Sequence, residues 1–176
     1  MMKCMRYLFI FGLFLAVFIG HTQLQADAKT FSKSFATDLK NGTLPGAVGK
    51  VGTKFGTIYK KLNGDVSSSE SFMNYSTTYT TYFYEPISRE SIYFNQPTKA
   101  LEGTYIHKYT KASIRKQLRP LAYQPAYDSY VNKTKTNLYK AGRFYAYIDR
   151  TNNGTRVIVS TKWAIKNYFM IDKIYE

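Results

Sequence analysis

The feature that most constrains the fold is a strict alternation of side chains along residues 143–149. One set is Phe144, Ala146 and Ile148, and the set between them includes Tyr145 and Tyr147. A period of two predicts a β-strand with one apolar face and one phenolic face. The Asn153-Gly154 step that follows is a strong hairpin signal, because Asn and Gly tolerate positive φ angles. We therefore expect the chain to return antiparallel along residues 156–161.

A short helix followed by an antiparallel meander is predicted twice. Helical spacing is seen in two sets of apolar residues, Phe55, Ile58, Tyr59 and Leu62, and then Ile114 and Leu118. Thr110 is the predicted N-cap of the second helix. We expect residues 53–108 to form the first repeat and residues 109–176 the second, joined in one compact domain behind an N-terminal lead-in, residues 29–52. The predicted class is α+β, with a largely antiparallel sheet and helices on one face.

The expected strands follow from alternation and turn residues. They are residues 75–85, 91–95 and 103–108 in the first repeat, and residues 129–131, 143–149, 156–161 and 163–169 in the second. Residues 65–71 are expected to form a polar loop, and a loop rich in Tyr and Pro is expected to run to residue 128. The lead-in is expected to hold one short helix, residues 30–39.

The first residues of the chain have the features of a secretory signal. Lys3 and Arg6 precede an uninterrupted apolar run, residues 7–20, and Ala26-Asp27-Ala28 gives a small-x-small cleavage pattern. We interpret residues 1–28 as a signal peptide, with an uncleaved anchor as the alternative. The expected location is outside the cell, with retention at a Gram-positive wall as one variant. No cysteine follows Cys4, so the mature chain is held by its core rather than by disulfides.

Charge and aromatic content together suggest a binding surface. Lys plus Arg number 25 against 11 Asp plus Glu, and removal of residues 1–28 leaves a formal charge of +13. Seventeen of the residues are Tyr, whose ring packs while its hydroxyl stays wet. The residues predicted to bind on an open sheet face are Tyr82, Tyr84, Tyr93, Tyr145 and Tyr147, fringed by Arg89, Arg143 and Arg156. We expect this face to dock an anionic cell-envelope polymer or an acidic protein by electrostatic capture and Tyr contacts. The plainer interpretation is that Tyr favours strands and the cations keep the protein soluble.

Three other function classes stay open. A small secreted ribonuclease could use one Glu as base, His107 as acid and an Arg on the phosphate. The available parts are Glu85, Glu90 or Glu102 with Arg89 or Arg143, while Asp128 and Asp149 are the carboxylates considered for a glycosidase. An inhibitor of another secreted protein is the third class, and nucleic acid is an unfavoured partner. No metal-ligand spacing and no Gly-rich phosphate loop occurs in the sequence, so neither a metal nor a cofactor is expected.

Turn and helix motifs give a resemblance to known families. The stretch Lys40-Asn41-Gly42-Thr43-Leu44-Pro45-Gly46, then Val51-Gly52-Thr53 and Tyr59-Lys60-Lys61-Leu62-Asn63-Gly64, resembles the opening of an uncharacterised secreted Bacillus-type domain family. The tandem helix-plus-meander layout is similar to that of bacterial β-lactamase inhibitory proteins and related small periplasmic assembly lipoproteins. The resemblance covers roughly residues 38–170. It implies a sheet that serves as a docking surface, and it implies no enzymatic activity.

Overall fold

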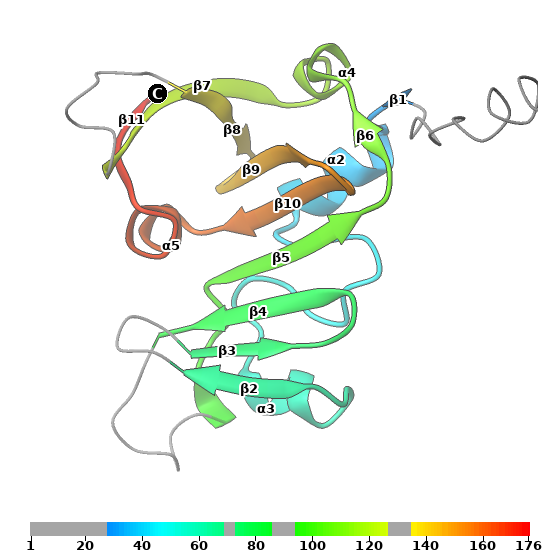
Figure 1. Ribbon diagram of the computed structural model, residues 1–176. Coiled ribbons are helices and arrows are strands. Elements are labelled where there is room, and N and C mark those ends of the chain that lie inside the picture. Colours follow the sequence, from blue (N-terminus) through cyan, green and yellow to red (C-terminus); the bar gives the residue numbers. More distant parts are fainter. Residues whose placement is uncertain (1–27, 69–72, 86–93, 127–134) are drawn as a thin grey trace, which may run out of the picture.

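The computed structural model describes residues 28–68, 73–85, 94–126 and 135–176, and in these residues the main feature is a nine-stranded antiparallel sheet (Figure 1). The strand order is β11-β7-β8-β9-β10-β5-β4-β3-β2. The strands are β2 (Asp65–Ser68), β3 (Met73–Ser76), β4 (Thr80–Tyr84), β5 (Ala100–Tyr105), β7 (Arg119–Pro125), β8 (Lys135–Ala141), β9 (Phe144–Thr151), β10 (Gly154–Ser160) and β11 (Ile171–Tyr175). A separate parallel pair joins β1 (Ala28–Lys29) to β6 (Lys108–Tyr109). The expected α+β class and antiparallel sheet are confirmed.

Short helices precede or interrupt the strands, and three of the four described have a side-chain N-cap. They are α2 (Lys33–Lys40), α3 (Phe55–Tyr59), α4 (Lys111–Arg115) and α5 (Lys162–Asn167). Ser32, Thr110 and Thr161 each accept a hydrogen bond from the backbone N–H three residues later, which satisfies a donor that the first helical turn leaves open. The N-cap role predicted for Thr110 is confirmed.

The two meanders meet at their last strands. The chain runs from α3 through β2 to β5, then from α4 through β7 to β10, and β5 pairs with β10 over Ala100↔Ser160 to Tyr105↔Thr155. This element order matches the expected order of helix and meander. An equivalence of the two halves as true repeats stays a prediction. The β9–β10 hairpin expected at Asn153-Gly154 is confirmed, with Thr151 opposite Gly154.

Several expected element assignments are wrong. Residues 163–169 were expected to form a strand, yet α5 occupies this segment because the Thr161 hydroxyl caps it. Residues 65–71 begin with strand β2 rather than a loop, and the expected loop before residue 128 contains β7. Residues 75–85 are not one strand, because the Thr77 hydroxyl receives the Thr80 N–H and closes a turn between β3 and β4. Of the strand expected at residues 91–95, residues 91–93 lie outside the described residues, and residues 94–95 form a 3₁₀ turn rather than a strand. The strand expected at residues 129–131 lies outside the described residues.

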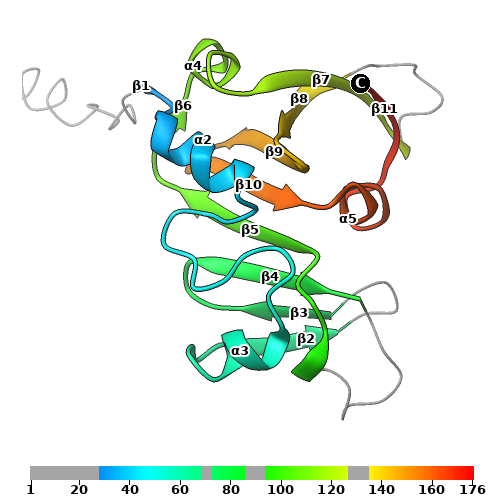
Figure 2. The same cartoon turned by 180° about the vertical axis from the view of Figure 1, so that it is seen from behind.

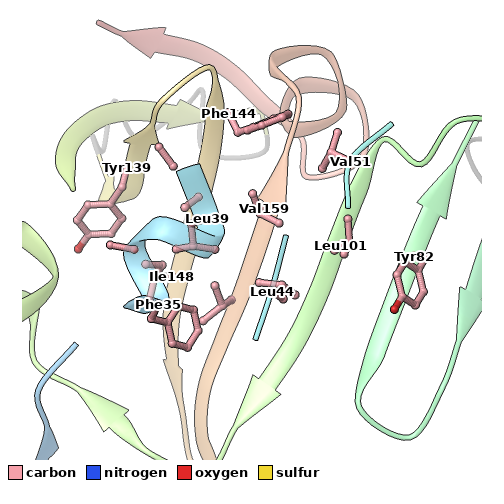
Figure 3. Packing of buried hydrophobic residues seen from close by; sticks show 14 of the residues in the cluster. Phe35, Leu39, Leu44, Val51, Tyr82, Leu101, Tyr139, Phe144, Ile148 and Val159 are labelled. Carbon is pink, nitrogen blue, oxygen red and sulfur yellow. The ribbon is translucent and has the colours of Figure 1, made fainter. Parts of the chain in front are cut away.

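One face of the sheet is covered by α2, residues 41–52 and α3, as Figure 2 shows. The alternation along β9 and β10 places Ile148 and Val159 on this side. Figure 3 shows how this core packs between helix, lead-in and strands. Its labelled members are Phe35, Leu39, Leu44, Val51, Tyr82, Leu101, Tyr139, Phe144, Ile148 and Val159.

The opposite face is covered in part by α5 and β11. Ala164 of α5 packs with Ile158, Ala100 and Phe83, and Ile165 packs with a second group that includes Tyr145. In Figure 1 the strands β7, β8 and β11 curl toward α5 at this end of the molecule. The expectation that all helices lie on one face is therefore wrong for α5, because two consecutive apolar side chains of this helix cover the second face.

Candidate functional site

Two of the predicted binding tyrosines belong to the core. Tyr82 is 1% exposed and Tyr84 is 0% exposed, on the face covered by α3. The Tyr84 ring meets the Phe55 ring edge-on at 5.3 Å between centroids, and the Tyr82 hydroxyl accepts the Val48 N–H at 3.2 Å. The predicted outward orientation is wrong because the ring of Tyr packs in a core as the ring of Phe does, and the Tyr84 hydroxyl is buried without a hydrogen-bond partner among the described residues. Burial raises the pKa of both phenols.

Tyr145 lies on the expected face but is not open to a partner. It is 2% exposed, its hydroxyl donates to the Glu176 carboxylate, and the Lys140 ammonium lies 4.0 Å from its ring centroid. The covering segment is β11 together with Glu176, the residue that follows it. The prediction of an exposed Tyr145 is therefore wrong, because the C-terminal residues cover this ring.

The remaining predicted residues do not form one surface. Tyr93 and Arg89 lie outside the described residues. Arg143 is exposed in the β8–β9 turn, with its guanidinium 4.9 Å from the Phe144 ring centroid, and lines a separate cavity of about 370 Å³ with Lys99 and Lys162. Tyr147 and Arg156 are the predicted pair that the structure does bring together.

Tyr147 and Arg156 lie in a concave site that we name the tyrosine cleft. Its volume is about 330 Å³. The lining residues are Tyr123, Pro125, Lys135, Tyr147, Arg156, Tyr168, Phe169 and Met170. The site is formed where β7, β8, β9 and β10 curl toward the segment between α5 and β11.

The tyrosine cleft combines phenolic rings with the Arg156 guanidinium and the Lys135 ammonium. Arg156 lies over the Tyr147 ring, 5.6 Å from its centroid, which is a cation–π distance. The Tyr123 and Tyr147 rings are 6.2 Å apart at 66°. The Tyr123 hydroxyl donates to Asn137 Oδ1 at 2.6 Å. Burial raises the pKa of Tyr123 and of Tyr168, so both phenols stay protonated.

The charge on Arg156 has carboxylates nearby. Asp149 is its register partner on β9, at a position where cross-strand side chains are neighbours. Burial raises the pKa of the Glu102 carboxyl, and Arg156 acts in the opposite direction. Among the described residues no acceptor pairs with the buried Nε of Arg156. The Arg156 charge is thus balanced by nearby carboxylates, while its Nε–H makes no hydrogen bond with the described residues.

A split in the sheet separates the tyrosine cleft from a second concavity. Pairing of β8 with β9 runs from Ala141↔Phe144 to Leu138↔Tyr147 and then stops, although β8 begins at Lys135 and β9 continues to Thr151. Residues 135–137 and residues 148–151 therefore diverge. Lys135 lines the concavities on both sides of the split.

We name the second concavity the basic cleft. Its volume is about 320 Å³. It is lined by three cations and one carboxylate, Lys111, Lys135, Arg150 and Asp149, together with Tyr109, Ile114, Asn137, Tyr139, Ile148 and Thr155. The Arg150 Nε donates to the Tyr109 carbonyl at 2.9 Å, which orients the guanidinium. Burial raises the pKa of Tyr109 and of Tyr139, so these phenols are hydrogen-bond donors rather than anions.

The basic cleft was not predicted from the sequence. Its cations come from α4, β8 and β9, which are brought together only by the fold. One signal was available, because Arg150 continues the apolar side of β9 two residues after Ile148. A charge at the end of a core-facing set indicates the point where that face meets solvent.

The parts considered for a hydrolase have other partners. The His107 Nε2 lies 3.3 Å from the Lys29 ammonium, and in the described part of the chain no carboxylate is hydrogen-bonded to this ring. Glu85 is ion-paired with Lys99 at 3.2 Å. Glu90 and Asp128 lie outside the described residues. The residues that the structure describes contain no group of three or more His, Cys, Asp and Glu placed to hold a metal ion.

Comparison of the chain with protein-family models, with curated proteins and with solved structures finds no match. The resemblance inferred from the turn motifs therefore stays a prediction. Across the described ranges, no helix has both the length and the apolar character needed to cross a membrane.

Proposed function

We propose that this protein is a secreted, non-enzymatic binding protein that holds an anionic cell-envelope polymer at the basic cleft. The observation that carries the proposal is the lining of this cleft, in which Lys111, Lys135 and Arg150 outnumber the single carboxylate of Asp149. Opposite charge on a ligand is attracted into a concavity of this sign, and the attraction raises its local concentration.

The chemistry of the cleft suits phosphate or carboxylate groups. Its lysines offer ammonium groups, and Arg150 offers a guanidinium whose Nε is already fixed on the Tyr109 carbonyl. The Tyr109 and Tyr139 phenols keep their protons. A ligand oxygen in this cleft can therefore meet both cations and neutral donors.

The shape of the site favours a polymer over an acidic protein. The basic cleft and the tyrosine cleft are concavities of about 320 and 330 Å³ that share Lys135. Volumes near the lower limit of ligand pockets, about 300 Å³, fit small units rather than a protein surface. Two adjoining concavities can receive successive units of one chain. The strongly basic composition, a formal +14, suits a polyanion of many repeats.

The test measures binding of poly(glycerol phosphate) by calorimetry at rising NaCl concentration. We expect the affinity to fall steeply between about 50 mM and about 500 mM salt, because the Debye length shrinks several-fold across this range. The double variant Lys111→Gln/Lys135→Gln removes two cations from the cleft. At about 0.5–1 kcal/mol for each charge contact, the affinity falls about 5- to 30-fold.

The matched control is Lys60→Gln/Lys61→Gln, which removes the same charge at exposed positions at the end of α3. Figure 1 shows α3 and α4 at opposite ends of the molecule. The control is expected to lose less than half as much binding free energy. Equal losses in the two double variants, or an affinity unchanged by salt, would contradict the proposal. Binding of poly-glutamate without binding of poly(glycerol phosphate) would replace it with an acidic protein as partner.

A further inference from the structure

We propose that the tyrosine cleft is a subsite for a neutral hydroxylated ring, a sugar unit, that works independently of net charge. The inference builds on the proposed function in one respect, since the ring is taken to belong to the polymer held at the basic cleft. The basic cleft would then bind the charged group of one polymer repeat, and the tyrosine cleft would bind its sugar ring.

The lining of the tyrosine cleft matches the two kinds of surface that a sugar presents. The C–H groups of a sugar are apolar and pack against the electron-rich face of a phenol ring. The rings of Tyr123, Tyr147, Tyr168 and Phe169 supply such surface. Hydroxyl groups at the sugar rim need donors and acceptors, and phenol hydroxyls provide both. A volume of about 330 Å³ accommodates one or two rings.

The charge balance of the cleft favours a neutral group over an anion. Arg156 and Lys135 are the cations in the lining, and Arg156 has Asp149 as register partner and Glu102 close enough to affect its electrostatics. An anionic ligand would compete with these two carboxylates for Arg156. Hydroxyl oxygens can instead accept hydrogen bonds from the guanidinium without adding a further charge.

The cleft is also connected to the basic cleft by structure. The Tyr123 hydroxyl donates to Asn137 Oδ1 at 2.6 Å, and Asn137 lines the basic cleft. Lys135 lines both concavities. A phosphate and a ring that are adjacent in a polymer can therefore occupy adjacent sites.

The test uses the neutral disaccharide N,N′-diacetylchitobiose and the full mature chain, followed by NMR. We expect the disaccharide to shift the ring signals of Tyr147 and Tyr168, to the same extent at low and high salt and in Lys111→Gln. In Arg156→Met the affinity for the disaccharide is expected to fall at least about fivefold, because the loss of one hydrogen-bonding group costs about 1 kcal/mol. The matched control is Arg143→Met, which removes an exposed arginine that also lies over an aromatic ring.

The outcomes separate this inference from the proposed function. Binding of poly(glycerol phosphate) without any shift from the disaccharide would overturn the ring subsite and leave the basic cleft standing. Disaccharide binding without polymer binding would overturn the proposed function and leave the ring subsite standing. Equal effects of Arg156→Met and Arg143→Met would overturn the subsite, because the effect would then not depend on the cleft. If Arg156→Met folds poorly, the NMR titration of the wild-type protein with the disaccharide still shows whether the ring subsite exists.

Discussion

Replacement of Tyr84 by Ala separates an interior role for this tyrosine from a binding role. Tyr84 is 0% exposed and packs against Phe55 in the core beneath α3. An aromatic side chain buries about 150–250 Å², which at about 25 cal/mol per Å² corresponds to about 4–6 kcal/mol. Measured truncations of large aromatic side chains cost about 3–5 kcal/mol. We therefore expect Tyr84→Ala to lose about 3–5 kcal/mol of unfolding free energy.

The assay is urea unfolding followed by circular dichroism, with a thermal scan beside it. A loss of about 3–5 kcal/mol corresponds to a melting temperature lower by about 6–20 °C for a domain of this size. The control is Tyr79→Ala, because Tyr79 is 83% exposed next to β4 and its removal costs less than about 0.5 kcal/mol. If Tyr84→Ala unfolds at the same urea concentration as Tyr79→Ala, the assignment of the Tyr84 ring to the core is wrong.

Two further predictions concern the backbone and the C-terminus. Gly154 has φ +149° and an added Cβ would lie 2.0 Å from the Tyr105 carbonyl, so Gly154→Ala is expected to destabilise by more than the roughly 1–2 kcal/mol of positive φ alone. The control is Gly52→Ala, because Gly52 has φ +93° with open space around it and its replacement causes only backbone strain. Equal melting temperatures of the two variants would refute the predicted clash between the added Cβ and the Tyr105 carbonyl. Hydrogen bonds from Lys162 and then from Tyr145 lower the pKa of Glu176 from 4.5 to about 2. The stabilisation by this carboxylate is therefore complete above pH 4.5 and lost as the pH falls toward 2, so wild type and Glu176→Gln should differ in melting temperature at pH 5.5 and converge near pH 2. A difference that stays constant over this range would contradict the pairing.

The parts of the fold that could be predicted are those fixed by local chemistry. The Asn153-Gly154 hairpin and the Thr110 cap depend on residues within a few positions of each other, and both are present. The sequence of α5 does not reveal the helix, because its short apolar run also suits a strand and a single Thr161 cap is a weak local signal. Contacts with Ile158 and Ala100 stabilise this helix, and no local pattern reveals them.

The binding surface was only partly predictable because Tyr does not indicate which face it occupies. Its ring suits a core and its hydroxyl suits water, so alternation with Thr placed Tyr82 and Tyr84 outward when the structure buries them. Tyr147 and Arg156 lie together because alternation puts both side chains on the same face of the β9–β10 hairpin. The basic cleft needs α4 beside β8 and β9, which is long-range information.

The junction of the two meanders imposes an order on the maturation of the chain. The outer edge of β5 is completed only by β10, whose residues lie 50 to 60 positions further along between Tyr105↔Thr155 and Ala100↔Ser160. A polypeptide made from its N-terminus exposes that edge until residues 154–160 have emerged. Unprotected edges recruit other chains, so premature termination before residue 154 should yield an aggregating product rather than a smaller stable one.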